Sequence, residues 1–351
     1  MISLTRPTLQ AYAVSAALGI AGALIALRIG SPLPWFLGPM VANAIFAIAG
    51  VPLRGPDFLR PVALPVLGVM LGSTFRPELF AHAAEWAVSL AMIPLYVLAS
   101  SAVNYAYFRK VAGCDHVTAY FSSMPGGLND MLIMGSENGG DEKQIALAHA
   151  LRVLISVGVI AVILSMLFGV SNGSARRTFI GLSDFDLHDA ATLIICAVLG
   201  PILGKRFGIP ARMILGPLAM SAAVHLFSVV EIGPPTALSL GAQFVLGAGV
   251  GGRFAGIRLR SAARLMLHGS ISALIATFVA ALFGLVVIAA TDIDFFAGFL
   301  AFAPGGMMEM SLLALAINQS VAYVTLSHIV RYMVVAIFAG AAFRMTARRD
   351  R

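Results

Sequence analysis

Charged side chains are scarce in this chain of 351 residues. Asp, Glu, Lys and Arg make up 11% of the sequence, whereas 59% of it is hydrophobic. A soluble domain carries about 25% charged residues, so the composition indicates an integral membrane protein. The net charge of +7 fits an excess of Lys and Arg in cytoplasmic loops. No basic cluster comes with an aromatic or groove-reading motif, so we expect no nucleic-acid partner.

Cysteine is also rare, and the histidines are scattered. Cys114 and Cys196 lie far apart, so the sequence offers neither a disulfide framework nor a cysteine-based metal site. The seven histidines show no ligand spacing for a copper or iron cluster. The sequence also lacks a nucleotide-binding motif. We therefore expect no metal, no cofactor and no enzymatic activity.

What the sequence has instead is a series of apolar runs. Most approach the length of about 20 residues that a membrane span needs. The expected spans are residues 11–29, 35–50, 58–75, 86–108, 143–170, 187–207, 211–230, 237–256, 265–290 and 320–343. Helix breakers interrupt two further apolar segments, at 116–138 and 294–317. The fold class is therefore an all-α polytopic membrane protein.

The two interrupted segments share a motif, Pro-Gly-Gly with an acid five residues after the proline. It comprises Pro125, Gly126, Gly127, Asn129 and Asp130, and, 179 positions later, Pro304, Gly305, Gly306 and Glu309. Proline removes a backbone donor, and glycine frees the chain to reverse. The motif thus predicts a hairpin with two arms of about ten residues, each about 15 Å long, reaching the bilayer midplane.

A duplication accounts for more than this motif. His149 and Arg152, which share one helix face at this spacing, recur as His328 and Arg331 at the same offset. We therefore divide the chain into a first membrane repeat, residues 1–180, and a second, residues 181–351. The polar stretch 171–189 joins them. Asp141 and Ser320, again matched, are predicted N-caps of the helices that carry the His-x-x-Arg pairs.

The basic residues indicate how the repeats are oriented. If each broken segment enters and leaves the membrane on one face, each repeat has five crossings. Seventeen loop Lys and Arg residues then lie on the side of the N-terminus, and four lie opposite. If the broken segments cross instead, the bias reverses between the halves, which the positive-inside rule disfavours. The count predicts inverted-topology repeats with both termini cytoplasmic.

Buried charge beside the breaks points to function. An intramembrane carboxylate is costly and is a functional candidate by default, which singles out Asp130 and Glu309. The duplicated His-x-x-Arg pair is expected to hold the hairpin and contact substrate. A permanently charged Arg152 or Arg331 suits either an anionic substrate or a structural partner for the acids, and histidine suits proton coupling. The sequence leaves these alternatives open.

The duplicated pattern resembles the AbrB family of bacterial membrane proteins: Pro-Gly-Gly-x-x-(Asp/Glu)-Met, then His-x-x-Arg about twenty residues on. The resemblance covers nearly the whole chain. It implies a multi-pass protein of the bacterial inner membrane, described within the family as a transporter, a regulator of gene expression or an ammonia monooxygenase. Inverted five-helix repeats with glycine-rich re-entrant hairpins are also similar to bacterial citrate and glutamate symporters.

These features favour a secondary transporter that works by alternating access, with the two hairpin tips forming the site. Because no nucleotide-binding motif is present, any active transport would be driven by a gradient of protons or another ion. Its partners would be a small solute or ion and the lipid bilayer, and a homodimer is the one assembly we consider. An indirect role in gene regulation is the alternative, although the chain has no long tail or loop for signalling. A membrane monooxygenase ranks last, because no metal-ligand spacing is present.

Overall fold

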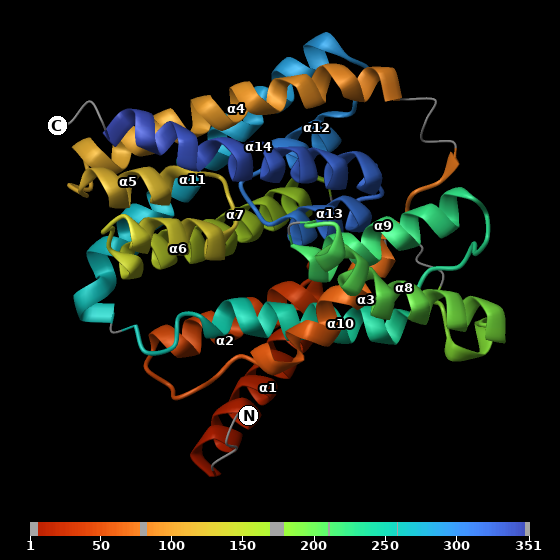
Figure 1. Ribbon diagram of the computed structural model, residues 1–351. Helices are drawn as coiled ribbons and strands as arrows, with labels where there is room; N and C mark the ends of the chain where they lie inside the picture. The colour runs from red at the N-terminus through yellow and green to blue at the C-terminus, as the bar shows by residue number, and fades with distance from the viewer. Residues whose placement is uncertain (1–5, 78–82, 169–178, 210, 258, 348–351) are drawn as a thin grey trace. The chain divides into compact units, whose positions relative to one another are not determined.

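A computed structural model shows the chain as a set of α-helices connected by short loops (Figure 1). It describes residues 6–77, 83–168, 179–209, 211–257 and 259–347. Within these ranges every regular element is a helix. The all-helical class expected from the composition is therefore confirmed.

The chain forms two compact units, and each of them draws on both halves of the sequence. Unit 1 comprises Met1–Ala81, Val162–Ile257 and Ala316–Ala322. Unit 2 comprises His82–Ala161, Arg258–Leu315 and Tyr323–Arg351. The Pro-Gly-Gly motifs, their acids and both His-x-x-Arg pairs belong to unit 2, whereas Ser320 belongs to unit 1. The predicted join of the repeats at 171–189 lies partly outside the described residues.

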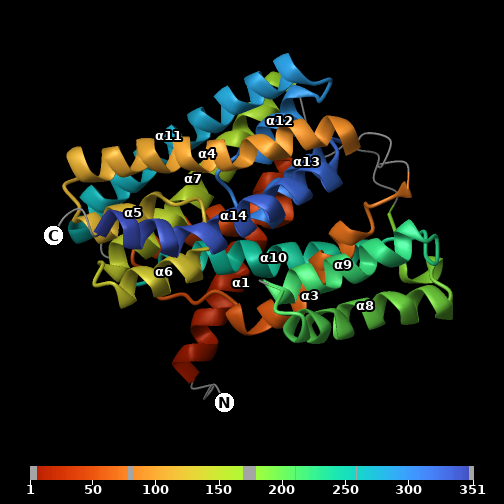
Figure 2. The same cartoon turned by 45° about the horizontal axis from the view of Figure 1, so that its top comes forward.

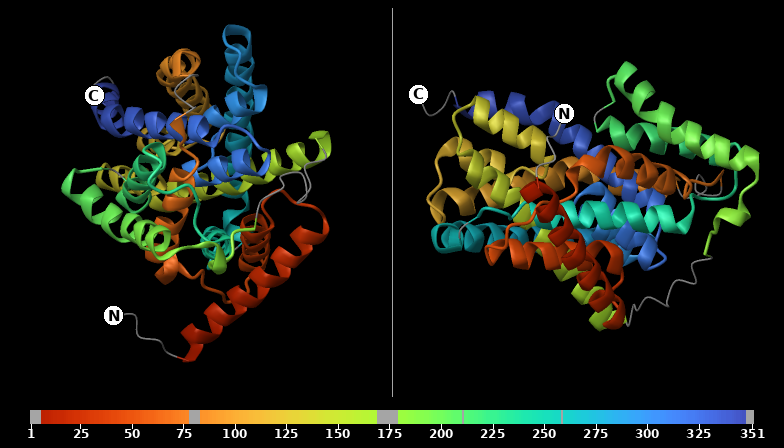
Figure 3. Two further views of the ribbon diagram at one scale, coloured as in Figure 1. Left: turned by 90° about the vertical axis from the view of Figure 1, so that its right-hand side faces the viewer. Right: turned by 90° about the horizontal axis from the view of Figure 1, so that it is seen from below.

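Unit 1 is a bundle of helices that pack in pairs. Its elements are α1 (Arg6–Arg28), α2 (Pro34–Ile48), the 3-10 turn η1 (Asp57–Leu59), α3 (Arg60–Gly72), the 3-10 turn η3 (Leu182–Asp184), α8 (Leu187–Arg206), α9 (Arg212–Leu226) and α10 (Thr236–Gly252). Helix α1 packs on α2, α2 on α10, α10 on α3, α3 on α9 and α9 on α8. Figure 3 shows the green pair α8 and α9 side by side in both views.

Glycines let the helix backbones of unit 1 approach closely. A Cβ added to Gly38 would lie 2.4 Å from the carbonyl oxygen of Gly22, and one added to Gly216 would lie 2.1 Å from that of Gly200. These two pairs are equivalent positions of the repeat. Gly247 allows a similarly close approach, since a Cβ at this position would lie 2.2 Å from the Phe36 carbonyl oxygen. Small residues at such positions are typical of helix packing in membranes.

Unit 2 contains the long helices and both broken segments. Its elements are α4 (Ala83–Lys110), α5 (His116–Ser123), α6 (Leu128–Glu137), most of α7 (Glu142–Phe168), α11 (Leu259–Ala290), α12 (Phe295–Phe302), most of α13 (Met307–Ala316) and most of α14 (Val321–Ala347). Helix α4 packs on α11, α5 and α12, α11 packs on α12, and α5 packs on α6 (Figure 2). Tyr96, Phe283 and Phe302 form an aromatic cluster in its core, with ring centroids 5.4–5.5 Å apart.

The elements of the two halves recur in the same order, at offsets of 178 or 179 residues. Helices α5, α6 and α7 become α12, α13 and α14 when 179 is added to their bounds, and α2 becomes α9 when 178 is added. That the two sets run in opposite directions across a membrane stays a prediction.

Six of the described helices are long and apolar enough to cross a membrane: Thr8–Arg28, Ala84–Lys110, Glu142–Met166, Leu187–Arg206, Ala263–Ala290 and Val321–Met345. The other four expected spans, which form α2, α3, α9 and α10, have 13 to 17 residues. Such helices are about 20–26 Å long, shorter than the hydrocarbon core of about 30 Å.

Local signals lie at the ends of two of these shorter helices. Gly50, with φ of +89°, follows α2 in the left-handed region that favours glycine. The hydroxyls of Ser73 and Thr74 donate to the carbonyls of Met70 and Leu71 at the end of α3. A hydropathy pattern reports which residues are apolar, but it does not predict where these helices end.

Candidate functional site

The first helix break lies at Met124–Gly127, between α5 and α6. Met124 and Gly127 have extended backbones, with ψ of 131° and 134°. The chain then returns, because the amide of Asp141, just before α7, donates to Oγ1 of Thr118 in the first turn of α5 at 2.9 Å. The Asp141 side chain accepts from the amide of Gln144, which confirms it as the N-cap of α7. The two ends of the segment 116–138 therefore lie close together.

The second break, between α12 and α13, repeats this local geometry. Ala303 is extended, with ψ of 139°. The Met310 amide donates to the Gly306 carbonyl at 3.1 Å, as the Met131 amide does to that of Gly127 at 3.0 Å. Both proline rings are buried, as is Gly305, while Gly126, Gly127 and Gly306 are partly exposed.

The first His-x-x-Arg pair binds the backbone at the end of α5. Nε2 of His149 lies 2.9 Å from the carbonyl oxygen of Phe121. Arg152 donates to the carbonyls of Ser122 at 2.5 Å and Met124 at 2.6 Å. Both side chains are buried.

The second pair makes matching contacts at the end of α12. Nε2 of His328 lies 2.9 Å from the Leu300 carbonyl oxygen. Arg331 donates to the carbonyls of Ala303 at 2.7 Å and Gly305 at 2.8 Å, and more weakly to that of Phe302 at 3.4 Å. The bonds to Leu300 and Ala303 are those of His149 and Arg152 shifted by 179 residues.

These contacts solve the main physical problem of a broken helix. The last four carbonyls of a helix lack intrahelical partners, and that end carries partial negative charge. In a membrane such groups must be satisfied by protein or by water in a cavity. A buried guanidinium presents several donors in a fixed fork, so one arginine satisfies two carbonyls at once. The His-x-x-Arg pair therefore acts as a cap for the first arm of each hairpin.

The acids of the motif lie at the opposite end of the break. Asp130 and Glu309 occupy the first turns of α6 and α13, where the positive end of the helix dipole stabilises a carboxylate. Each side chain folds back over the second glycine of its motif. A Cβ added to Gly127 would lie 2.6 Å from Oδ2 of Asp130, and one added to Gly306 would lie 2.0 Å from Oε2 of Glu309. Glycine at these two positions leaves room for the acid.

The two acids differ in their surroundings. Glu309 is buried, whereas Asp130 is exposed and accepts a hydrogen bond from Oη of Tyr332 at 2.6 Å. Subtracting 179 from Tyr332 gives Val153, which has no hydroxyl. Sequence reasoning missed Tyr332. A comparison of the two repeats could have found it, because a tyrosine in the second repeat stands at the position of a valine in the first. The side chain of Asn129, the remaining residue of the predicted site, lies outside the described part of the chain.

A half-open cleft of about 260 Å³ adjoins Asp130 and Tyr332 between α6 and α14. Apart from these two residues and the backbone of Gly127, its lining is apolar: Met131, Ile133, Met134, Val335 and Ala336. An apolar pocket with a few convergent polar groups is the usual form of a small-molecule site. Among the described residues, this cleft is therefore the candidate place for a small molecule beside the first hairpin.

Tyr96 is a second residue that sequence reasoning missed. It is fully buried, and its hydroxyl makes no hydrogen bond of normal geometry to the described residues. Arg331 and Arg152 are both electrostatic neighbours of this hydroxyl. Tyr96 therefore lies near the capping arginines of both hairpins, within unit 2. No repeat or motif in the sequence signals it.

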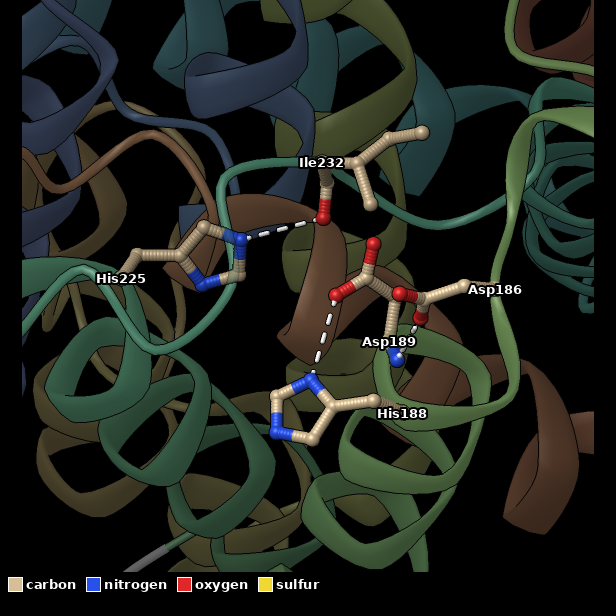
Figure 4. A network of polar contacts seen from close by, with 5 residues as sticks. All are labelled: Asp186, His188, Asp189, His225 and Ile232. Carbon is tan, nitrogen blue, oxygen red and sulfur yellow. Dashed lines mark hydrogen bonds and ion pairs between the residues drawn. The ribbon is translucent and has the colours of Figure 1, made fainter.

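A separate group of metal-ligating side chains lies in unit 1. Ligand atoms of Asp186, His188 and Asp189 all lie within 4.8 Å of one another (Figure 4). Asp186 is the N-cap of α8 and accepts from the Asp189 amide at 2.7 Å, and the cluster is largely exposed. Helix capping accounts for the arrangement. His225 in the same view ties the end of α9 to Ile232, whose carbonyl oxygen lies 3.2 Å from Nε2.

Six apolar helices of spanning length and two helices broken at matching positions define a multi-pass helical membrane protein. The chain belongs to the AbrB family, since the family model described as "Transition state regulatory protein AbrB" matches residues 35–347. It is similar to "Putative regulator AbrB" of Escherichia coli (strain K12), with 26% identity over 85% of each chain. It is also similar to "Uncharacterized protein YhjN" of Bacillus subtilis (strain 168), with 24% identity over 94% of this chain and 91% of the relative.

Proposed function

We propose that this protein is a secondary transporter of the bacterial inner membrane, which moves a small solute by alternating access. The observation that carries the proposal is the pair of broken helices in unit 2, each with a buried arginine of its own repeat that donates to the carbonyls at the end of the first arm. Broken helices at corresponding positions of two repeats are the main pointer to a transporter's binding site. A kink used only for packing would not need a buried arginine to satisfy its backbone carbonyls.

The membrane arrangement that goes with this function has two inverted repeats. Each would contribute five crossings and one re-entrant hairpin, with both termini in the cytoplasm. The asymmetry of seventeen against four loop basic residues supports it. The return of the chain from Asp141 to Thr118 supports a segment that enters and leaves on one face.

The arginines have a structural task in this proposal. Each guanidinium donates to at least two backbone carbonyls, so it already offsets the negative end of a helix. The acid that is open to a solute is Asp130. We therefore assign the arginines to holding the hairpins and the cleft beside Asp130 to contact with the solute.

A ligand screen followed by a transport assay tests the function. Purified protein is screened for thermal stabilisation by metabolites at several pH values, with and without Na⁺. Each stabilising compound is then assayed for counterflow into proteoliposomes. We expect at least one compound to accumulate only in vesicles that contain the protein, and the double variant Asp130→Asn, Glu309→Gln to abolish its accumulation. Absence of counterflow for every stabilising compound would contradict the proposal.

The matched control is Glu137→Gln, at the exposed end of α6. It removes one carboxylate from the same hairpin at a distance from the break. We expect this variant to transport like the unmodified protein. An equal loss in Glu137→Gln would mean that the hairpin responds to charge in general.

A further inference from the structure

The cleft beside Asp130 offers a ligand one negative group and little else that is polar. One oxygen of Asp130 accepts from Tyr332, and a carboxylate has further lone pairs to accept from a ligand. The oxygen of Tyr332, which donates its own hydrogen to Asp130, can also accept. The described lining therefore presents two acceptors side by side, 2.6 Å apart.

The remaining walls decide which kind of cation fits. Divalent cations need about six or more oxygen ligands, and five of the lining side chains here are apolar: Met131, Ile133, Met134, Val335 and Ala336. An inorganic ion would lose its water against these walls without replacement. An organic ammonium instead needs one or two acceptors for its head and apolar contact for its body. The Tyr332 ring and the methionines also suit it, because aromatic faces attract cations and thioethers are polarizable.

Of the two hairpins that the structure describes, only the first carries this pair of acceptors. At the position equivalent to Tyr332, the first repeat has Val153, and the acid equivalent to Asp130 is the buried Glu309. The second hairpin therefore lacks both the phenol and the exposed carboxylate. The duplication supplied two hairpins, and later divergence left one of them with this pair of acceptors.

We propose that the cleft formed by Asp130, Tyr332 and the apolar residues of α6 and α14 binds one primary amine with a short apolar chain, in its ammonium form. The ammonium group donates to Asp130 and to Oη of Tyr332, and the alkyl chain lies against Met131 and Val335. This inference deepens the proposed transport function, on which it rests, by naming the substrate class.

Calorimetric titration of the full-length protein in lipid nanodiscs tests the inference. The probes are n-butylamine, which is ionised at pH 7, the neutral n-butanol and the anionic butyrate, each corrected with empty nanodiscs. We expect saturable binding of butylammonium at one per chain and none of the other two. Removing a charged hydrogen-bond partner costs about 1.5–3 kcal/mol, so Asp130→Asn should weaken binding about tenfold or more. Tyr332→Phe should weaken it by less, and Glu137→Gln should leave it unchanged.

Three results would overturn the inference. They are absence of saturable butylammonium binding, equal binding of butyrate, and butylammonium binding that Asp130→Asn leaves unchanged. A pH-dependent stabilisation that needs Asp130 but occurs without amine binding would assign the carboxylate to a proton and likewise overturn it. The titration measures binding alone. If the protein does not bind butylammonium but shows counterflow of another solute, the amine site is rejected and the transport function stands. If it binds the amine but shows no counterflow of any solute, the amine site stands and the transport function is rejected.

Discussion

Arg331 donates a hydrogen bond from Nη2 to Nδ1 of His328, 2.8 Å away. Nδ1 must therefore be unprotonated, and the hydrogen of the ring lies on Nε2, which faces the Leu300 carbonyl. The two residues thus form one unit in which the imidazole is neutral and positions the guanidinium. Proton coupling, which the sequence left open for histidine, does not suit a His328 held in this way.

Substitution of His328 distinguishes a positioning role from a titrating one. Glutamine offers an amide donor for Leu300 and a carbonyl acceptor for Arg331, whereas leucine offers neither. We expect His328→Gln to retain most of the thermal stability and His328→Leu to lose it. Each unsatisfied buried group costs about 1–3 kcal/mol. Scanning fluorimetry in detergent measures both, and equal stability of the two variants would contradict the assignment.

Removal of the second arginine cap should destabilise unit 2. Arg331→Met leaves the carbonyls of Ala303 and Gly305 without their donor, at about 1–3 kcal/mol for each buried group. Arg344→Met is the matched control, because Arg344 is exposed near the end of the same helix. We expect a lower midpoint of thermal unfolding for Arg331→Met alone. If the control loses as much, the cap has no special part in stability.

Alanine at the second glycine of the motif should act through the acid that folds over it. In Gly306→Ala the new Cβ displaces the Glu309 carboxylate, which lies 2.0 Å from its position, and we expect a loss of about 0.5–2 kcal/mol, comparable with a lost helix cap. In a Glu309→Ala background the same change should cost less, since the two residues are coupled. Gly158→Ala, where a Cβ meets nothing within 4 Å, is the control. Additive losses in the double variant would contradict the contact.

Close helix packing in unit 1 makes a separate prediction. Gly216→Ala places a Cβ 2.1 Å from the Gly200 carbonyl oxygen, and backbone cannot yield cheaply. We expect a loss of about 1–3 kcal/mol, as for other overpacked sites. Gly241→Ala in α10 meets no atom within 4 Å and should cause no loss, since alanine is favoured over glycine inside a helix. Thermal unfolding of both variants measures the difference, and a stable Gly216→Ala would show that these helices separate readily.

The thiol of Cys114 should respond to pH in a defined direction. It lies in the loop between α4 and α5, where burial raises its pKa and the nearby charges of Asp115 and Asp141 raise it further. The reactive thiolate therefore forms only at higher pH than for a free cysteine, whose pKa is about 8.5. In a Cys196→Ala background, the alkylation rate should rise with pH later than that of a free thiol.

Asparagine at position 115 checks the electrostatic part of this shift. Asp115 is the N-cap of α5, and asparagine caps a helix equally well, so Asp115→Asn removes the charge and keeps the helix start. We expect its alkylation profile to move to lower pH. An unchanged profile would leave burial as the sole cause.

The sequence predicts the helix breaks well, because proline and glycine dictate backbone conformation locally. The break at Pro125, the cap at Asp141 and the shared face of His328 and Arg331 all follow from residue type and spacing. The partners of the arginines do not follow, because they are backbone carbonyls. Every residue has a backbone carbonyl, so no sequence motif indicates which carbonyls an arginine will bind. From the sequence, an acidic side chain is the partner to expect.

Two residues near the site are signalled by no motif, for a different reason. Tyr332 and Tyr96 are aromatic residues on apolar helices, where they are usually part of the core. Only the three-dimensional structure shows that Tyr332 bonds to Asp130, 202 positions away. The expected spans overestimate the lengths of α3, α9 and α10, because the apolar runs continue past the residues that end these helices.

The transport proposal depends on hairpins that enter and leave the membrane on one face, and cysteine accessibility tests this most directly. Arg176→Cys and Arg258→Cys are made singly in a Cys114→Ser, Cys196→Ala background, and intact cells are treated with a membrane-impermeant maleimide. The inverted repeats predict labelling at position 176 from outside, and labelling at 258 only after the membrane is opened. Equal labelling of both positions in intact cells would contradict the re-entrant hairpins and the transporter built on them.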